Sequence, residues 1–272
     1  MPSVHISLSA ETVFNIAGIN IGNSLVTTWL VMIFLVFLAV YSSMRLKTKP
    51  DSLQLILELL VGGLHKFFAD ILGDKINRYF PWLATLFIYI LALNWVSVLP
   101  GVGSVGIFRT ENEKIAGTVL AAATENDGPV LAQAESEKNR LEFTPIFRPG
   151  TADLNTTLAL ALLTVGYIQI AGFSNLGLSY LKKFFNITNP INFVVGLLEL
   201  VSEISRIISF AFRLFGNIFA GEVLLTVIAF LMPVLAPIPF LGLEIFVGFI
   251  QALVFSMLTA VFLQLAISHA EH

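Results

Sequence analysis

The 272-residue sequence contains no cysteine, only four histidines, and a low fraction of charged residues, 12%. The absence of cysteine excludes disulfides and thiolate chemistry. His5, His65, His269 and His272 lie at the termini or in a mixed polar segment, and they do not form a metal-ligand spacing such as HExxH. We therefore expect no metal site and no cofactor. A soluble domain carries roughly twice this charged fraction.

The net charge is also small, −3, so nothing in the composition points to nucleic acid as a partner. Hydrophobic residues, by contrast, make up 56% of the chain, and the mean hydropathy is +0.86. This balance indicates a protein that lies within a lipid bilayer.

Five segments have the length and hydropathy of transmembrane helices, since about 20 apolar residues cross about 30 Å of hydrocarbon. They cover residues 25–46, 79–100, 153–181, about 190–232 and 240–268. The expected fold class is all-α, a polytopic membrane protein of five transmembrane helices plus one interfacial amphipathic element.

Clusters of cations fix the orientation of these spans. Arg45, Lys47 and Lys49 follow the first span, and Lys182-Lys183 follows the third. Because cytoplasmic ends carry an excess of Lys and Arg, both clusters place the N-terminus outside and the C-terminus in the cytoplasm.

Two segments depart from a simple span. Residues 50–78 interleave apolar and charged side chains, which suits an interfacial helix or helical hairpin with Gly62-Gly63 as the candidate bend. The helix over residues 190–232, the fifth helical segment, is about 60 Å long, so it must tilt steeply, kink or begin outside the hydrocarbon.

Residues 1–23 have no cation ahead of their apolar residues, so we expect no signal peptide.

The long helix carries a polar stripe. Glu199, Glu203, Arg206, Arg213 and Asn217 fall within about 80° of one another on a helical wheel. Glu199 and Glu203 can both reach Arg206, which leaves a structural ion pair and a functional role equally open for it. No acid lies three or four residues from Arg213. Its counter-charge must therefore come from another helix or another chain.

A second polar group is expected at the outer end of the last two helices. Glu222 points away from Arg213 on the wheel, and Glu244 begins a stripe on the last helix that continues through Gly248 to Gln251. The proline-rich turn 233–239 brings Glu222 and Glu244 together. This predicts a polar route that opens outward and stops near Arg213.

Glu199 and Glu203 predict a second route that opens to the cytoplasm. A fixed cation between two such routes blocks a direct proton path and attracts a mobile carboxylate. Asp153 and Asn155 either line the external vestibule, or Asp153 is a helix N-cap; the sequence leaves both readings open.

The residues Arg213-Leu214-Phe215-Gly216-Asn217, with Ala220-Gly221-Glu222 and Gln251-Ala252, resemble subunit a of the F-type ATP synthase. Residues 151–155 (TADLN) and Asn23-Ser24 add to the resemblance, which covers nearly the whole chain. Two features depart from the family: some members carry histidine where Glu244 stands, and the loop 101–152 is longer than expected.

The resemblance implies a proton-translocating stator subunit of the Fo sector, without catalytic activity of its own, that offers two offset half-channels to a rotating ring of c subunits. It implies that Arg213 faces the ring, that Asn217, Glu222, Glu244 and Gln251 line the external half-channel, and that Glu199 and Arg206 lie on the cytoplasmic side. It further implies peripheral-stalk b subunits and the lipid bilayer as partners, and a bacterial plasma membrane as location. H⁺ and Na⁺ both stay open, because the carboxylate that binds the ion belongs to the ring.

The expected organisation has four parts. Residues 1–24 form an external N-terminal segment, and residues 25–100 hold the first span, the interfacial segment and the second span. Residues 101–152 form an external polar loop, partly disordered or a small cap, and residues 153–272 form an ion-translocation domain of three helices. The alternative is a stand-alone secondary transporter or channel, which often shows internal repeats; we find none here.

Overall fold

The computed structural model describes the chain in segments. These are residues 12–16, 19–44, 46, 51–99, 102, 106–110, 141–145, 147–177, 180, 184, 190–232 and 235–268.

Six long helices form the body of the described part of the chain. They are α1 (Asn23–Met44), α2 (Ser52–Leu72), α3 (Ile76–Val96), α6 (Leu154–Leu176), α8 (Pro190–Leu231) and α9 (Pro237–Ser268). Two 3-10 turns precede α3 and α6, namely η1 (Gly73–Lys75) and η2 (Gly150–Ala152). The all-α prediction is confirmed for every long element.

The described segments also contain four short strands, which were not predicted. β1 (Thr12–Ile16) pairs with β2 (Ile19–Gly22), and β3 (Gly106–Thr110) pairs with β4 (Leu141–Pro145), both antiparallel. These strands are rich in β-branched and aromatic residues, which favour extended backbone. They fall in the two segments expected to be external, 1–24 and 101–152, and the intervening residues 111–140 lie outside the described part of the chain.

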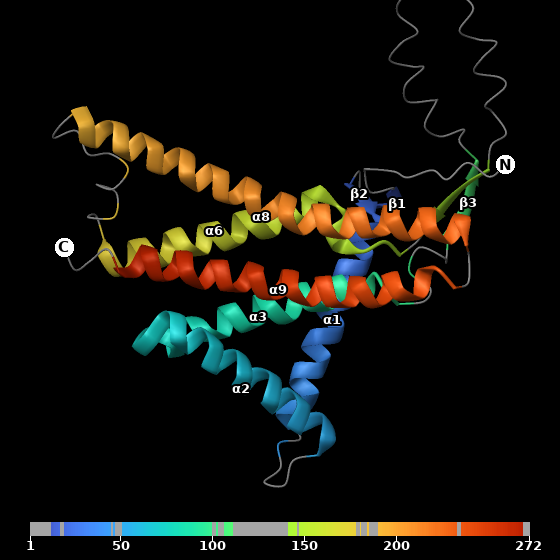
Figure 1. Ribbon diagram of the computed structural model, residues 1–272, viewed down its shortest axis with the longest axis horizontal. Coiled ribbons are helices and arrows are strands. Elements are labelled where there is room, and N and C mark those ends of the chain that lie inside the picture. Colours follow the sequence, from blue (N-terminus) through green and yellow to red (C-terminus); the bar gives the residue numbers. More distant parts are fainter. Residues whose placement is uncertain are drawn as a thin grey trace, which may run out of the picture.

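The helices α3, α6, α8 and α9 run side by side, with α9 packed against the other three (Figure 1). The helix α2 folds back beside α3 and also reaches α9, whereas α1 crosses the bundle steeply and contacts α3 and η2. Large side chains from several helices fill the core. The fully buried ones include Phe68, Tyr79, Phe87, Phe210 and Phe255.

Within the described residues, four helices, α1, α6, α8 and α9, are long and apolar enough to cross a membrane. The segment predicted as the second span is α3, and ten of its 21 residues are buried within the bundle. The predicted long helix is present as a single element, α8. It has 42 residues and is about 63 Å long at 1.5 Å per residue.

Three helix boundaries differ from prediction. The predicted third span ends early, since α6 stops at Leu176, where Gly177 takes a positive φ of 57° that side chains rarely adopt. The helix α2 continues straight through Gly62-Gly63, and the turn lies instead at Gly73, with a φ of 56°. The last helix starts at Pro237, inside the predicted turn, because proline fits the first helical turn.

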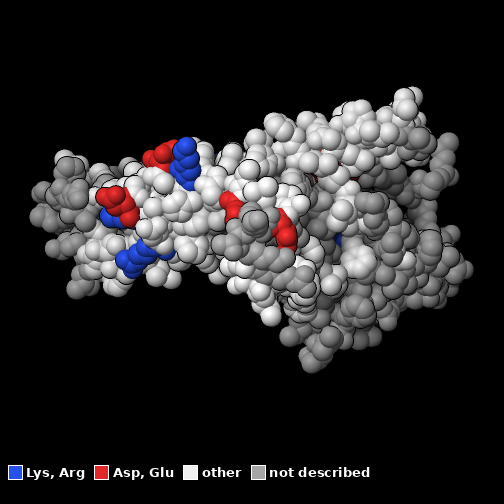
Figure 2. Space-filling view, turned by 90° about the horizontal axis from the view of Figure 1, so that it is seen from below, with Lys and Arg blue, Asp and Glu red and all other residues white. Residues whose placement is uncertain are grey.

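On the face shown in Figure 2, basic and acidic side chains lie together toward one end of the molecule, and further acidic side chains lie near the middle. At the turn between α2 and α3, exposed residues of both signs include Asp70, Asp74, Lys75 and Arg78. Lys75 Nζ donates to the carbonyl of Ile267 at 3.3 Å, so this turn also holds the last residues of α9. The mixed composition of the segment 50–78 therefore reflects a charged helix turn beside the apolar bundle.

The helices α3 and α9 approach closely at a small residue. A Cβ added to Gly248 would lie 3.1 Å from Asn94 Cβ. Asn94 Nδ2 donates to the carbonyl of Gly248 at 3.1 Å, and Trp95 Nε1 donates to the carbonyl of Ile245 at 3.1 Å. These hydrogen bonds from α3 side chains to the α9 backbone thus set the position of one helix along the other.

We predict that Gly248→Leu destabilises the protein by about 1–3 kcal/mol, the usual effect of overpacking, because the new side chain must separate α3 from α9. Gly242→Leu on the same helix is the matched control, since no atom lies within 4 Å of its added Cβ. Thermal unfolding in detergent measures the difference. Equal unfolding temperatures for the two variants would contradict this packing.

Candidate functional site

Arg206 is held by two acids of its own helix. Its Nη1 lies 2.5 Å from Glu203 Oε1, and its Nη2 lies 3.8 Å from Glu199 Oε1. The guanidinium carbon also sits 4.3 Å from the ring centroid of Phe262 on α9, a cation–π contact. Of the two readings that the sequence left open, this geometry favours the structural ion pair. We call Glu199, Glu203, Arg206 and Phe262 the Arg206 cluster.

Tyr180, which follows the end of α6, lies near this cluster and was not predicted to do so. Its hydroxyl donates to Gln169 Oε1 at 2.7 Å, and its ring packs against Gly172, where an added Cβ would lie 2.6 Å from Cε2. Burial first, and then the negative charge of Glu203, raise the pKa of Tyr180 to about 12. The hydroxyl therefore keeps its proton and acts as a hydrogen-bond donor.

Arg213 lies at the middle of α8 in a different situation. Its Nη2 donates to Ser209 Oγ at 3.2 Å, four residues earlier on the same helix. Its Nη1 is buried and has no hydrogen-bond partner. Within the described segments no acidic side chain forms an ion pair with Arg213, which agrees with the prediction that its own helix offers none.

At the other end of α8, Glu222 forms an ion pair that the sequence did not suggest. Glu222 Oε2 lies 3.3 Å from Nη2 of Arg148, a residue of the segment between β4 and η2. The Arg148 side chain is 5% exposed and that of Glu222 is 34% exposed. Arg148 lies in the segment expected to be a polar loop, where arginine is common. The one sequence feature that could have indicated its role is its position just before residues 151–155.

Glu244 is brought to the same place from α9. Its Oε1 lies 3.0 Å from the Cβ position of Gly221 and accepts a hydrogen bond from Ser97 Oγ at 3.2 Å. The structure thus places the Glu244 carboxylate against the residue that precedes Glu222, as the turn between α8 and α9 predicts. We call Ser97, Arg148, Glu222 and Glu244 the Glu222 cluster.

Asp153 is the N-cap of α6. Its Oδ1 accepts from the backbone N–H of Asn155 at 3.0 Å, and its Oδ2 accepts from Ser24 Oγ of α1 at 2.8 Å. The carboxylate therefore satisfies a helix end and ties two helices together.

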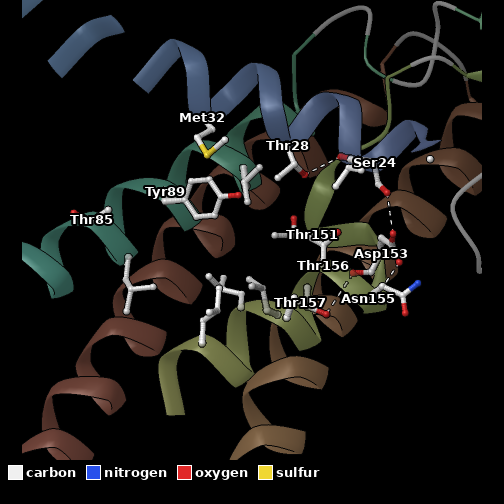
Figure 3. Close-up of a pocket in the computed structure, with 18 of the residues that line it drawn as sticks. Ser24, Thr28, Met32, Thr85, Tyr89, Thr151, Asp153, Asn155, Thr156 and Thr157 are labelled. Carbon is white, nitrogen blue, oxygen red and sulfur yellow. Dashed lines mark hydrogen bonds between the residues drawn. The ribbon is translucent and has the colours of Figure 1, made fainter. Parts of the chain in front are cut away.

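Asp153 also lines a cavity of about 870 Å³ between α1, α3 and α6 (Figure 3). Thr28, Thr151 and Asn155 make its polar end, while Met32 and Tyr89 line the opposite, more apolar part. The cavity reaches Leu214, the neighbour of Arg213 in sequence. The N-cap and the lining of a cavity are thus both properties of the same residue.

Asn217 and Gln251 are both half-buried. Neither side chain makes a hydrogen bond within the described residues, and neither is joined to Arg213. The structure therefore groups Glu222 with Glu244, and Arg206 with its two acids, but it does not connect Asn217 or Gln251 to either cluster by hydrogen bonds.

The protein is an integral membrane protein, because its apolar helices are long enough to cross a bilayer. It holds ion pairs among these helices. A model of the ATP synthase A chain family matches residues 25–264, and the chain belongs to this family.

The matches to named relatives extend over most of this chain and over most of each relative. The ATP synthase subunit a of Citrifermentans bemidjiense is 29% identical over 248 residues, covering 91% of this chain and 89% of the relative. The ATP synthase subunit a of Moorella thermoacetica is 29% identical over 252 residues, covering 92% and 93%. A sodium-ion-specific ATP synthase subunit a from Propionigenium modestum is 31% identical over 264 residues, covering 96% and 80%.

We predict that Asp153→Ala lowers the free energy of unfolding by about 1 kcal/mol, because the cap of α6 is lost, whereas Asp153→Asn largely retains it. Ser24→Ala, which removes only the hydroxyl that bonds to Asp153, isolates the contribution of the tie to α1. Chemical denaturation in detergent measures all three variants. An Asp153→Asn variant as unstable as Asp153→Ala would show that the charge, and not the cap, holds this end.

Proposed function

We propose that the chain is the ion-translocating stator subunit of the membrane sector of an F-type ATP synthase. In this role it offers two offset half-channels to a rotating ring of c subunits, and ion flow through them drives ATP synthesis elsewhere in the complex. Its membership of the ATP synthase A chain family supports the role. The subunit has no catalytic activity of its own.

The observation that carries this proposal is the charge of Arg213. Arg206 and Arg148 both have acidic partners, but Arg213 has none among the described residues, and one of its nitrogens is buried without a bond. Arginine keeps its charge at every physiological pH, so it cannot carry the proton itself. A carboxylate arriving at about 4 Å would gain roughly 4 kcal/mol at an effective dielectric of 20, which favours release of its ion.

Polar groups lie on both sides of Arg213 along α8. Glu222 is nine residues further on, about 13 Å, and Arg206 is seven residues back, about 10 Å. Asn217, Glu222, Glu244 and Gln251 belong to the outer half-channel in this account. Glu199, Glu203 and Arg206 belong to the inner one, where the ion pairs set the charge of the channel wall.

The cavity beside Asp153 supports an entry route from the outer side. It begins among polar side chains, Asp153 and Asn155 included, and reaches Leu214. An ion admitted there is passed to a ring carboxylate, which then turns through lipid. On returning from the other side, the carboxylate meets Arg213 and gives up its ion to the inner route, so the ring must rotate for ions to cross.

The proposed topology has five spans. The helix α3 is the fifth, since it packs along α9, one of the four apolar helices. The helix α2 lies at the cytoplasmic interface, the N-terminus outside and the C-terminus inside. A 22-residue α1 can stand upright, and because α8 and α9 cross it steeply, these two lie strongly tilted (Figure 1).

The partners follow from this role. They are the ring of c subunits, the b subunits of the peripheral stalk and the surrounding lipid of a bacterial plasma membrane. The transported ion is H⁺ or Na⁺, because one relative is named as sodium ion specific and the ion-binding carboxylate lies on the ring.

We predict that Arg213→Ala abolishes coupled ion transport while the chain still inserts and assembles. Loss of an attraction of roughly 4 kcal/mol corresponds to about a thousandfold. ATP-driven cation uptake into inverted vesicles measures it, with Arg78→Ala, in the first turn of α3, as the control for loss of an arginine. Normal pumping by the Arg213 variant would refute the mechanism.

We predict that Glu222→Gln slows translocation severalfold with little effect on assembly, because the outer route loses an acceptor of positive charge. Passive cation flow through the membrane sector in proteoliposomes, at an imposed potential, gives the rate. A flux equal to that of the unaltered protein would remove Glu222 from the path.

A further inference from the structure

We propose that Arg148 is a working part of the outer half-channel: it is a fixed cation that positions the Glu222 carboxylate and weakens the hold of the entrance on the incoming cation. This inference rests on the proposed function. It concerns a residue from the segment before η2 and not from the transmembrane helices.

The position of Arg148 is fixed by the fold. Its side chain is 5% exposed, and the residues that follow it, Pro149 and Gly150, are buried. The 3-10 turn η2, which begins at Gly150, packs against both α8 and α1. A Cβ on Gly150 would overlap Thr28 Oγ1, so the backbone here lies directly against α1. The guanidinium is therefore held beside α8 and does not reach there as a loose surface side chain.

Several charged groups lie at this end of the protein. Glu222 faces Arg148 at 3.3 Å, and Glu244 comes from α9 with its carboxylate against Gly221. Asp153, at the start of α6, is engaged by Ser24 and by a backbone N–H. Ser97, at the end of α3, donates to Glu244. The carboxylates of Glu222 and Glu244 thus approach each other from two helices at this end, and Arg148 is paired with the first of them.

The Glu222 side chain is 34% exposed, so an incoming cation can reach its carboxylate. The carboxylate is reachable from outside the protein, yet one of its oxygens is already engaged by a guanidinium. An incoming cation must compete with Arg148 for the same acid. A channel site works when it binds an ion well enough to admit it but weakly enough to pass it on, and the competing cation provides that weakening.

The direction of the effect follows. Without Arg148, the entrance carries one more uncompensated negative charge and holds the cation more tightly. The external cation concentration for half-maximal flow should then fall about fivefold, the size of effect expected when a partly exposed ion pair is lost. The maximal rate should fall as well, because release toward the ring becomes slower.

The test uses the assembled complex in proteoliposomes at a fixed imposed potential. Initial cation flow is measured as a function of external pH and, separately, of external Na⁺. The variants are Arg148→Gln, Arg148→Lys, Glu222→Gln and the double variant Arg148→Gln/Glu222→Gln. The matched control is Arg78→Gln. Arg78 is an exposed arginine whose Nη2 donates to Ser174 Oγ at 3.3 Å.

We expect Arg148→Gln to lower both the half-saturating concentration and the maximal rate, and Arg148→Lys to restore most of the normal dependence. The double variant should behave like Glu222→Gln alone, because Arg148 acts through Glu222. If Arg148→Gln does not assemble, Glu222→Asp replaces it, since a shorter acid loses contact with the guanidinium while both charges remain. It should shift the concentration in the same direction by a smaller factor.

An unchanged or raised half-saturating concentration in an assembled variant overturns the role of Arg148, and so do additive effects in the double variant. These outcomes are separate from failure of the proposed function, which Arg213→Ala tests. If Arg213→Ala is inactive and Arg148→Gln is normal, the stator function stands and only the role of Arg148 falls.

Discussion

A guanidinium in the middle of an apolar helix needs negative charge close by, and in this protein it finds none on the described helices. Arg206 and Arg148 each have acidic partners, whereas Arg213 at the centre of α8 has none among the described residues. In the proposed mechanism, a carboxylate of the ring supplies that negative charge beside Arg213 and withdraws it again as the ring turns. The bundle supplies rigidity, with α9 packed against three neighbours, and the long α8 supplies separation between the two polar clusters.

Much of this arrangement could be predicted from the sequence, because it depends on spacing along helices. The isolation of Arg213 follows from the absence of acids one turn away. The pairing of Arg206 with its own helix follows from the i, i+3 position of Glu203, and the approach of Glu244 to the end of α8 follows from the short proline-rich connection. The membrane setting follows from hydropathy, since α1, α6, α8 and α9 coincide with predicted spans.

The features that could not be predicted depend on irregular backbone. Arg148 approaches α8 because of the turn η2, and no periodic pattern reports where such a segment runs. Two glycines within a helical pattern, Gly62-Gly63, looked like a bend, but a glycine breaks a helix only where packing requires a positive φ, which occurs at Gly73. Tyr180 folds back onto α6 because Gly172 leaves room for its ring, a tertiary contact without a local signal.

The most direct measurement of the central claim is disulfide formation between Arg213's helix face and the ring. The chain has no cysteine, so a single Ser209→Cys, at the exposed residue that accepts the hydrogen bond from Arg213, is unique. In the assembled complex it should form a disulfide with a cysteine placed beside the ion-binding carboxylate of a c subunit, and this bond should stop rotation. The account is contradicted if Ser209→Cys cross-links no better than a cysteine at Phe246, an exposed position on α9.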